Sequence, residues 1–93
     1  MRSRKEVESK VQVVLYTRPG CRLCQEMKEV MSSSGCTELY SLEEVDIESE
    51  AELFASYQFE IPVLFINGVE AFRHQLRADE FRAYVTALLN QQR

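Results

Sequence analysis

The amino-acid sequence predicts an α/β domain in which a four-stranded mixed sheet carries helices on both faces. Two short apolar runs, at residues 11–16 and 63–66, have the composition of strands buried on both sides. Segments whose apolar residues recur at the helical period lie between the strand-like segments and after them. Asn67-Gly68 separates two strand-like runs and is a strong signal for a tight hairpin. The predicted order is βαβαββα.

The first strand and helix meet at a cysteine. Val11–Tyr16 is a near-continuous run of β-branched and aromatic residues, and Thr17-Arg18-Pro19-Gly20 interrupts it. A helix is expected to begin at Cys21 and to end at Gly35, because glycine tolerates the left-handed conformation that often follows a helix. The residues expected on its inward face are Leu23, Met27, Val30, Met31 and Ser34.

A second strand and a second helix follow. Tyr40–Ile47 is expected as the strand, parallel to the first because a helix joins the two. Ser49 is expected to cap the next helix, since its hydroxyl suits the N-cap position. The apolar members of these two elements are Leu42, Val45 and Ile47, then Leu53, Phe54 and Tyr57.

The last third of the chain predicts a hairpin and a final helix. Ile61-Pro62 leads into the strand Val63–Ile66, and Val69–Phe72 is expected to return antiparallel to it. The final helix is expected to open at Arg77-Ala78-Asp79-Glu80. Its inward residues are predicted to be Phe81, Tyr84, Val85, Leu88 and Leu89.

Length and composition limit the classes of protein. Ninety-three residues fit one domain, expected at residues 11–93 behind a flexible, charged arm at residues 1–10. The net charge of −4 gives no reason to expect nucleic acid as a partner. No apolar run approaches the roughly 20 residues that cross a bilayer, and the N-terminus has no apolar signal core. We therefore expect a cytoplasmic monomer with no membrane partner.

The Cys21-Arg22-Leu23-Cys24 segment is the strongest chemical signal. A cysteine at a helix N-terminus meets unpaired backbone N–H groups and the positive end of the helix dipole. Together with Arg18 and Arg22, these are expected to lower the pKa of the Cys21 thiol from about 8.5 into the range of about 3.5–7.5. Cys21 is therefore the expected nucleophile, and Cys24, one turn further on, the expected resolving thiol.

Two other interpretations of the pair remain open. The same spacing occurs in zinc sites, but zinc prefers four ligands and only Cys36 and His74 could add to the pair. We therefore predict no metal. The two thiols could also be unreactive core residues, because free cysteine packs like a small hydrophobe. Cys36 and the methionines Met27 and Met31 are expected to be core, and His74 a surface residue.

Two segments resemble glutaredoxins. Tyr16-Thr-Arg-Pro-Gly-Cys-Arg-Leu-Cys24 is similar to their active-site segment, and Ile61-Pro-Val-Leu-Phe-Ile-Asn-Gly68 is similar to their second signature. The resemblance covers roughly residues 11 to 90 and implies a thioredoxin-like fold. Within this family the chain looks most like small glutaredoxin-like proteins rather than the efficient dithiol enzymes.

The resemblance implies a glutathione site. Arg18 stands where a basic residue contacts the glycine carboxylate of glutathione. Pro62 stands where a cis-proline faces the redox pair, which would leave the backbone N–H and C=O of Ile61 free to pair with a peptide or glutathione. Asp79 is expected near the amino end of the ligand or, equally, as a helix cap. Leu76 and Arg77 replace a Gly-Gly pair, so occlusion is expected to weaken glutathione binding, although Arg77 could pair with a ligand carboxylate instead.

The leading hypothesis is a thiol–disulfide oxidoreductase. Its expected substrates are disulfides in proteins or small molecules, including glutathione-mixed disulfides, and its expected reductant is glutathione or a thioredoxin-type protein. One alternative is a non-catalytic thioredoxin-fold module that binds a partner through a redox-sensitive contact. Another is an iron–sulfur carrier that bridges two protomers through Cys21 and glutathione.

Overall fold

The computed structural model describes residues 10–91, and these form one mixed sheet with helices on both of its sides. The strands are β1 (Val11–Thr17), β2 (Tyr40–Asp46), β3 (Val63–Ile66) and β4 (Val69–Arg73), and the α-helices are α2 (Arg22–Ser32), α3 (Ala51–Tyr57) and α4 (Ala78–Gln91). The strand order in the sheet is β2-β1-β3-β4. β1 and β2 are parallel, whereas β3 is antiparallel to both β1 and β4.

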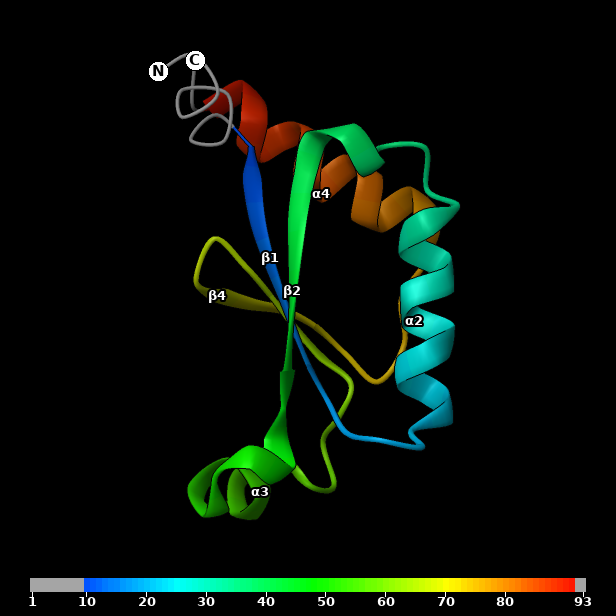
Figure 1. Ribbon diagram of the computed structural model, residues 1–93. Helices are drawn as coiled ribbons and strands as arrows, with labels where there is room; N and C mark the ends of the chain where they lie inside the picture. The colour runs from blue at the N-terminus through cyan, green and yellow to red at the C-terminus, as the bar shows by residue number, and fades with distance from the viewer. Residues whose placement is uncertain (1–9, 92–93) are drawn as a thin grey trace.

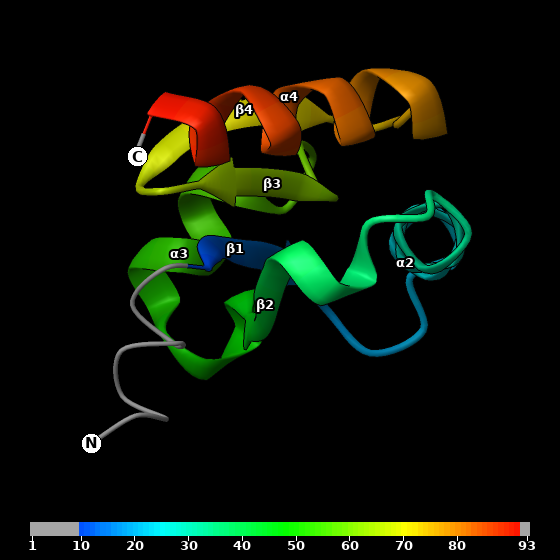
Figure 2. The same cartoon turned by 90° about the horizontal axis from the view of Figure 1, so that it is seen from above.

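The helices occupy opposite sides of this sheet. Figure 1 shows α2 and α4 on one side and α3 on the other. Viewed from above, α4 lies along the β3–β4 half of the sheet, and α2 stands nearer β1 and β2 (Figure 2). The predicted fold class and element order are confirmed. None of the helices in residues 10–91 combines the length and the apolar run that a membrane crossing requires.

The hairpin forms as predicted. Asn67 and Gly68 both have positive φ, 51° and 83°, which is the conformation of the two central residues in a type I′ turn. The Asn67 side chain also accepts a hydrogen bond from the backbone N–H of Gln12 at 2.9 Å, which ties the turn to β1. The predicted arm at residues 1–10 lies outside the described residues, apart from Lys10.

The main core fills the side of the sheet that α2 and α4 cover. Alternate residues of β1 point to this side, as the two-residue period of a strand requires, and α2 and α4 contribute one stripe each. Its buried members are Val11, Val13, Leu15, Met27, Met31, Cys36, Tyr40, Leu64, Ile66, Phe81 and Val85. Tyr84, Leu88 and Leu89 pack against it, so the predicted inward face of the last helix is confirmed.

A second cluster lies next to the start of α2. Its buried residues are Cys24, Ile47 and Ile61, and Tyr16, Cys21, Leu53, Phe54 and Tyr57 pack against them. The rings of Tyr16 and Tyr57 are nearly perpendicular, and their centroids are 4.9 Å apart. The second cluster therefore joins Cys21 and Cys24 to α3 and to the loop before β3.

Two predictions about the segment that follows β2 are wrong. Ile47 belongs to a 3-10 turn (Ile47–Ser49) rather than to β2, because the Asp46 side chain accepts the Glu48 N–H at 2.9 Å and turns the chain. Ser49 does not cap α3, since its hydroxyl donates to the Asp46 carbonyl at 2.7 Å. The N-cap position belongs to Glu50, without a side-chain hydrogen bond.

The predicted helix after Cys21 also differs at both ends. Leu23 is 45% exposed rather than inward, because the loop at residues 74–77 leaves a hollow beside it. The helix ends at Ser32, before Gly35. The hydroxyls of Ser33 and Ser34 donate to the carbonyls of Val30 and Met31, which satisfies groups that a longer helix would have paired. Gly35 instead turns the chain, with a φ of +84°.

Candidate active site

Cys21 is the N-cap residue of α2. Its backbone is extended, with φ −82° and ψ 108°, and its Sγ accepts a hydrogen bond from the Cys24 N–H at 3.1 Å. That N–H is one of the donors at a helix N-terminus that has no partner within the helix. The sequence change from an apolar strand to a helical pattern therefore places a sulfur atom where backbone dipoles stabilise negative charge.

Cys21 and Cys24 are joined as a disulfide. Their Cα atoms are 5.3 Å apart, inside the range over which two cysteines are bridged without backbone movement. Cys24 is 2% exposed, and it packs against Ile47 and Ile61, whereas Cys21 is only half-buried. A molecule that approaches from solvent therefore meets Cys21 first.

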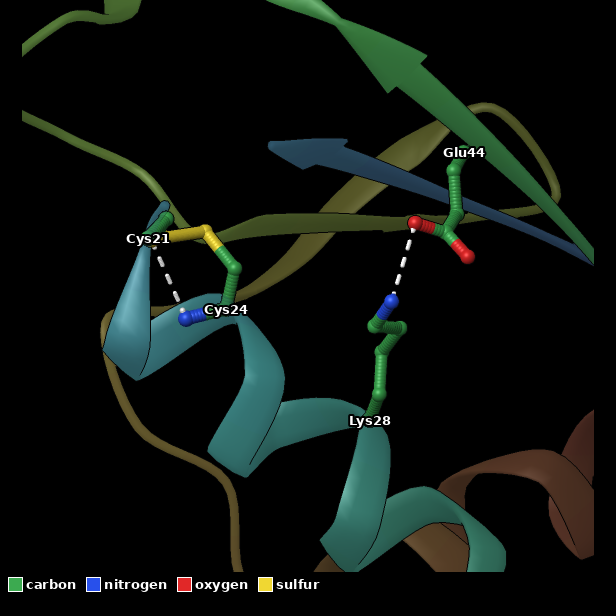
Figure 3. The surroundings of a disulfide bond; sticks show 4 residues. All are labelled: Cys21, Cys24, Lys28 and Glu44. Carbon is green, nitrogen blue, oxygen red and sulfur yellow. Dashed lines mark hydrogen bonds and ion pairs between the residues drawn. A yellow bond between two sulfur atoms is a disulfide. The ribbon is translucent and has the colours of Figure 1, made fainter. Parts of the chain in front are cut away.

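An open groove of about 600 Å³ runs beside Cys21. It is lined by residues 17–21 and by side chains of α2 and β2. Lys28 and Glu44 face each other across it, with Nζ and Oε1 3.2 Å apart (Figure 3). The charged residues that line the groove are Arg18, Arg22, Lys28, Glu44 and Asp46. The groove therefore offers both signs of charge to a ligand.

The two arginines near Cys21 have acidic partners. Arg18 forms an ion pair with Glu48 at 2.9 Å, and its guanidinium carbon lies 5.3 Å from the centre of the Phe54 ring. Arg22 is highly exposed and lies 3.7 Å from Glu26, one turn along α2. These partners reduce the positive potential that the two arginines would otherwise place at Cys21. The N-terminus of α2 is therefore the more direct source of positive potential at the Cys21 sulfur.

The loop before β3 carries the predicted cis peptide bond at Ile61-Pro62. Ile61 is buried and belongs to the same cluster as Cys24. The expectation that the Ile61 N–H is free is wrong, because it donates to the Tyr57 carbonyl at 3.2 Å as α3 ends. The Pro62 carbonyl accepts the His74 N–H at 2.7 Å, which ties this loop to the end of β4.

Arg77 and Asp79 pair with each other at the start of α4. Arg77 Nε lies 3.5 Å from Asp79 and 3.6 Å from Glu80, and Asp79 accepts the Glu80 N–H at 2.9 Å. The nearby arginine lowers the pKa of Asp79 against the opposing effect of desolvation. Both side chains are exposed, and these partners lie within the same first turn.

The segment between β4 and α4 contains one residue with a left-handed backbone. It is His74, with a φ of 71°, and neither Leu76 nor Arg77 has a positive φ. The expectation that the side chains of Leu76 and Arg77 occlude a ligand concerns space rather than backbone conformation, and it stays a prediction. His74 is exposed, as expected.

Several residues of the site were not anticipated. Gln25, Lys28, Glu44 and Asp46 line the groove beside Cys21. The helical period could have suggested Gln25 and Lys28, which lie four and seven residues after Cys21. Nothing in the sequence marks Glu44, because its position depends on the register that pairs it with Leu15.

Cys36 lies apart from Cys21 and Cys24. It is buried in the main core, and its Sγ lies 3.2 Å from the Ser34 hydroxyl. Within residues 10–91 no three or more histidine, cysteine or acidic side chains are grouped so that they could hold a metal ion.

The sequence also matches a known family. Residues 12–86 match the model of the glutaredoxin-like domain (DUF836). The chain belongs to this glutaredoxin-like family. The domain is 30% identical over 88 residues to the glutaredoxin-like protein YDR286C homolog of Dictyostelium discoideum, a match that covers 88% of this chain and 82% of that protein.

Solved structures show the same fold for the glutaredoxin-like domain. Protein XcR50 from X. campestris matches with a TM-score of 0.68 and 25% identity, over 81% of this chain and 96% of that one. Protein Ne2328 from Nitrosomonas europaea matches with a TM-score of 0.68 and 29% identity, over 82% and 92%. A mutant thioredoxin from Halobacterium salinarum NRC-1 shares the fold at 15% identity and a TM-score of 0.59, over 94% and 83%. The resemblance to thioredoxin-fold glutaredoxin-like proteins is thereby confirmed.

Proposed function

We propose that this glutaredoxin-like domain is a thiol–disulfide oxidoreductase that reduces disulfides in proteins or glutathione-mixed disulfides. The observation that carries the proposal is the position of Cys21. Its sulfur caps a helix N-terminus and accepts the Cys24 N–H, while Cys24 lies within bonding reach and shielded from solvent. One accessible sulfur and one shielded sulfur are what a two-step exchange requires.

The reaction proceeds by two exchanges of sulfur. In the reduced protein, the Cys21 thiolate attacks one sulfur of the substrate disulfide; the S–S bond of the substrate breaks and a thiolate leaves. Cys24, as a thiolate, then attacks Cys21, forms the Cys21–Cys24 bond and releases the second substrate thiolate. The substrate gains two electrons and, from water, two protons, and the protein loses the same number. Two thiols of a glutathione or thioredoxin-type reductant restore the dithiol by the reverse exchange.

Glutathione is proposed as one reductant. It carries two carboxylates and one ammonium group, and the groove beside Cys21 contains side chains of both signs. Arg18 would bind the glycine carboxylate in place of Glu48, and Asp79 would lie near the amino end. The Ile61 carbonyl and Pro62 complete the loop against which an extended ligand would lie. Arg77 would contribute by turning from Asp79 and Glu80 to a ligand carboxylate.

The test is reduction of two substrates, a glutathione-mixed disulfide and a protein disulfide. We expect the native protein to reduce at least one of them catalytically with glutathione or a thioredoxin system. Cys21→Ser should abolish turnover, and Cys24→Ser should accumulate a mixed disulfide at Cys21 that mass spectrometry detects. Cys36→Ala is the matched control, and its turnover per folded molecule should equal that of the native protein. Undiminished turnover by Cys21→Ser, or no reduction of either disulfide, would contradict the proposal; the second result would favour a binding module.

A further inference from the structure

A second hollow lies on the other flank of α2 from the charged groove. Its volume is about 230 Å³, and it lies between α2 and the loop that joins β4 to α4. The apolar residues that line it are Leu23, Met27, Val30 and Leu76. Glu26 and His74 are among the polar residues at its edge.

Leu23 is the unusual member of this set. It stands between Cys21 and Cys24 in the first turn of α2, and it is 45% exposed. A single exposed leucine is ordinary on a protein surface. This one lines a hollow, and it stands two residues after Cys21, in the first turn of the helix that Cys21 caps. Because Leu23 is so near Cys21 along the helix, the residues next to the cysteine of a bonded polypeptide have this hollow within reach.

The size of the hollow indicates what fits it. Pockets that enclose a whole small molecule usually measure about 300–1,000 Å³, and this hollow is smaller. It has room for one aliphatic side chain. Since its lining includes the buried Met27 and the half-buried Leu76, such a side chain would gain contact with apolar surface on entering.

The charge at the edge of the hollow disfavours glutathione as its occupant. The arginines and the lysine near Cys21 line the larger groove, whereas the charged group of the small hollow is the Glu26 carboxylate, 3.7 Å from its partner Arg22. A carboxylate at the edge disfavours the anionic ends of glutathione and accepts a neutral or basic peptide.

We propose that the hollow formed by Leu23 and Leu76 is a specificity site for a protein disulfide, and that it holds an aliphatic side chain adjacent to the reacting cysteine of the substrate. This rests on the proposed function, because it assigns the substrate class of the same redox pair. Leu23 and Leu76 are specificity residues and take no part in the exchange of sulfur.

The experiment uses two peptide disulfides of equal length and charge. One carries leucine and the other asparagine next to the cysteine, and reduction by the dithiol form of the protein is followed in a single turnover. The native protein should reduce the leucine peptide about tenfold faster, the lower end of what one apolar group contributes in a pocket. Leu23→Ser should remove most of this preference, and Leu23→Met should keep it.

Leu42→Ser is the matched control. Leu42 is 40% exposed on the edge strand β2 and does not line the hollow, so this variant should keep the native preference. Circular dichroism of each variant shows whether the fold is intact. Equal rates on both peptides, or equal losses in Leu23→Ser and Leu42→Ser, would overturn the specificity site and leave the redox function standing. Failure to reduce either peptide would overturn both.

Discussion

Cys24 and Cys36 are equally buried, at 2% exposure each, yet their surroundings differ in kind. Cys24 packs in the second cluster, bonded to a sulfur at the N-terminus of α2. Cys36 packs in the main core, where the Ser34 hydroxyl lies against its sulfur. Burial alone therefore does not distinguish the proposed redox thiol, Cys24, from Cys36. The distinguishing features are a second sulfur within reach and a helix end that stabilises a thiolate.

The largest expected contrast is in alkylation of the reduced protein. Below pH 7 we expect iodoacetamide to modify Cys21 first, because it is the most exposed of the three and lies at the helix N-terminus. Cys36 should react more slowly than Cys21 by a factor on the order of 10³ or more, since its exposure requires opening of the core. Peptide mapping by mass spectrometry measures the order. Earlier labelling of Cys24 or Cys36 would reverse the roles assigned to these cysteines.

A smaller contrast is expected in stability. Cys36→Ala removes a sulfur from the main core and should lower the free energy of unfolding by about 1–2 kcal/mol. Urea unfolding in the presence of a reductant measures this effect without a contribution from the disulfide. Leu42→Ala, on the exposed edge strand, should change the free energy of unfolding by less than about 0.5 kcal/mol. If the two variants have the same free energy of unfolding, the buried Cys36 side chain does not stabilise the core.

The smallest contrast concerns pH and the neighbour of Cys36. Burial raises the pKa of Tyr40 above its ordinary value of 10.0, and the nearby Cys36 raises it further. The raised pKa means that the unfolded chain loses this proton at a lower pH than the folded protein. The contribution of Tyr40 to stability is therefore complete below pH 10 and decreases as pH rises through its folded pKa.

The Tyr40→Phe variant tests this pH dependence. Its free energy of unfolding should fall less steeply than that of the native protein above pH 10, while the two curves stay parallel at neutral pH. Urea unfolding at a series of pH values measures both. Parallel curves throughout the alkaline range would show that Tyr40 ionises as easily in the folded protein as in the unfolded chain.

The sequence predicts the framework of the redox site well, because local rules decide it. The period change at Cys21, the Asn67-Gly68 turn and the apolar face of α4 are local features, and each appears in the structure. The predictions failed where a polar side chain forms one of several hydrogen bonds that nearby backbone groups allow. The Asp46 carboxylate accepts the Glu48 N–H and its carbonyl accepts the Ser49 hydroxyl, so β2 ends before Ile47 and α3 lacks the expected cap.

By itself, the sequence determined the α/β class, the element order and the placement of two cysteines one turn apart at the start of a helix. Only the tertiary structure decided which surfaces flank those cysteines. The register of β2 brings Glu44 opposite Lys28, and the loop from β4 to α4 leaves Leu23 open and joins it with Leu76. Local pattern fixes the elements because it depends on neighbours in the chain, whereas the flanks of the site depend on contacts between residues distant in the chain, which no local pattern encodes.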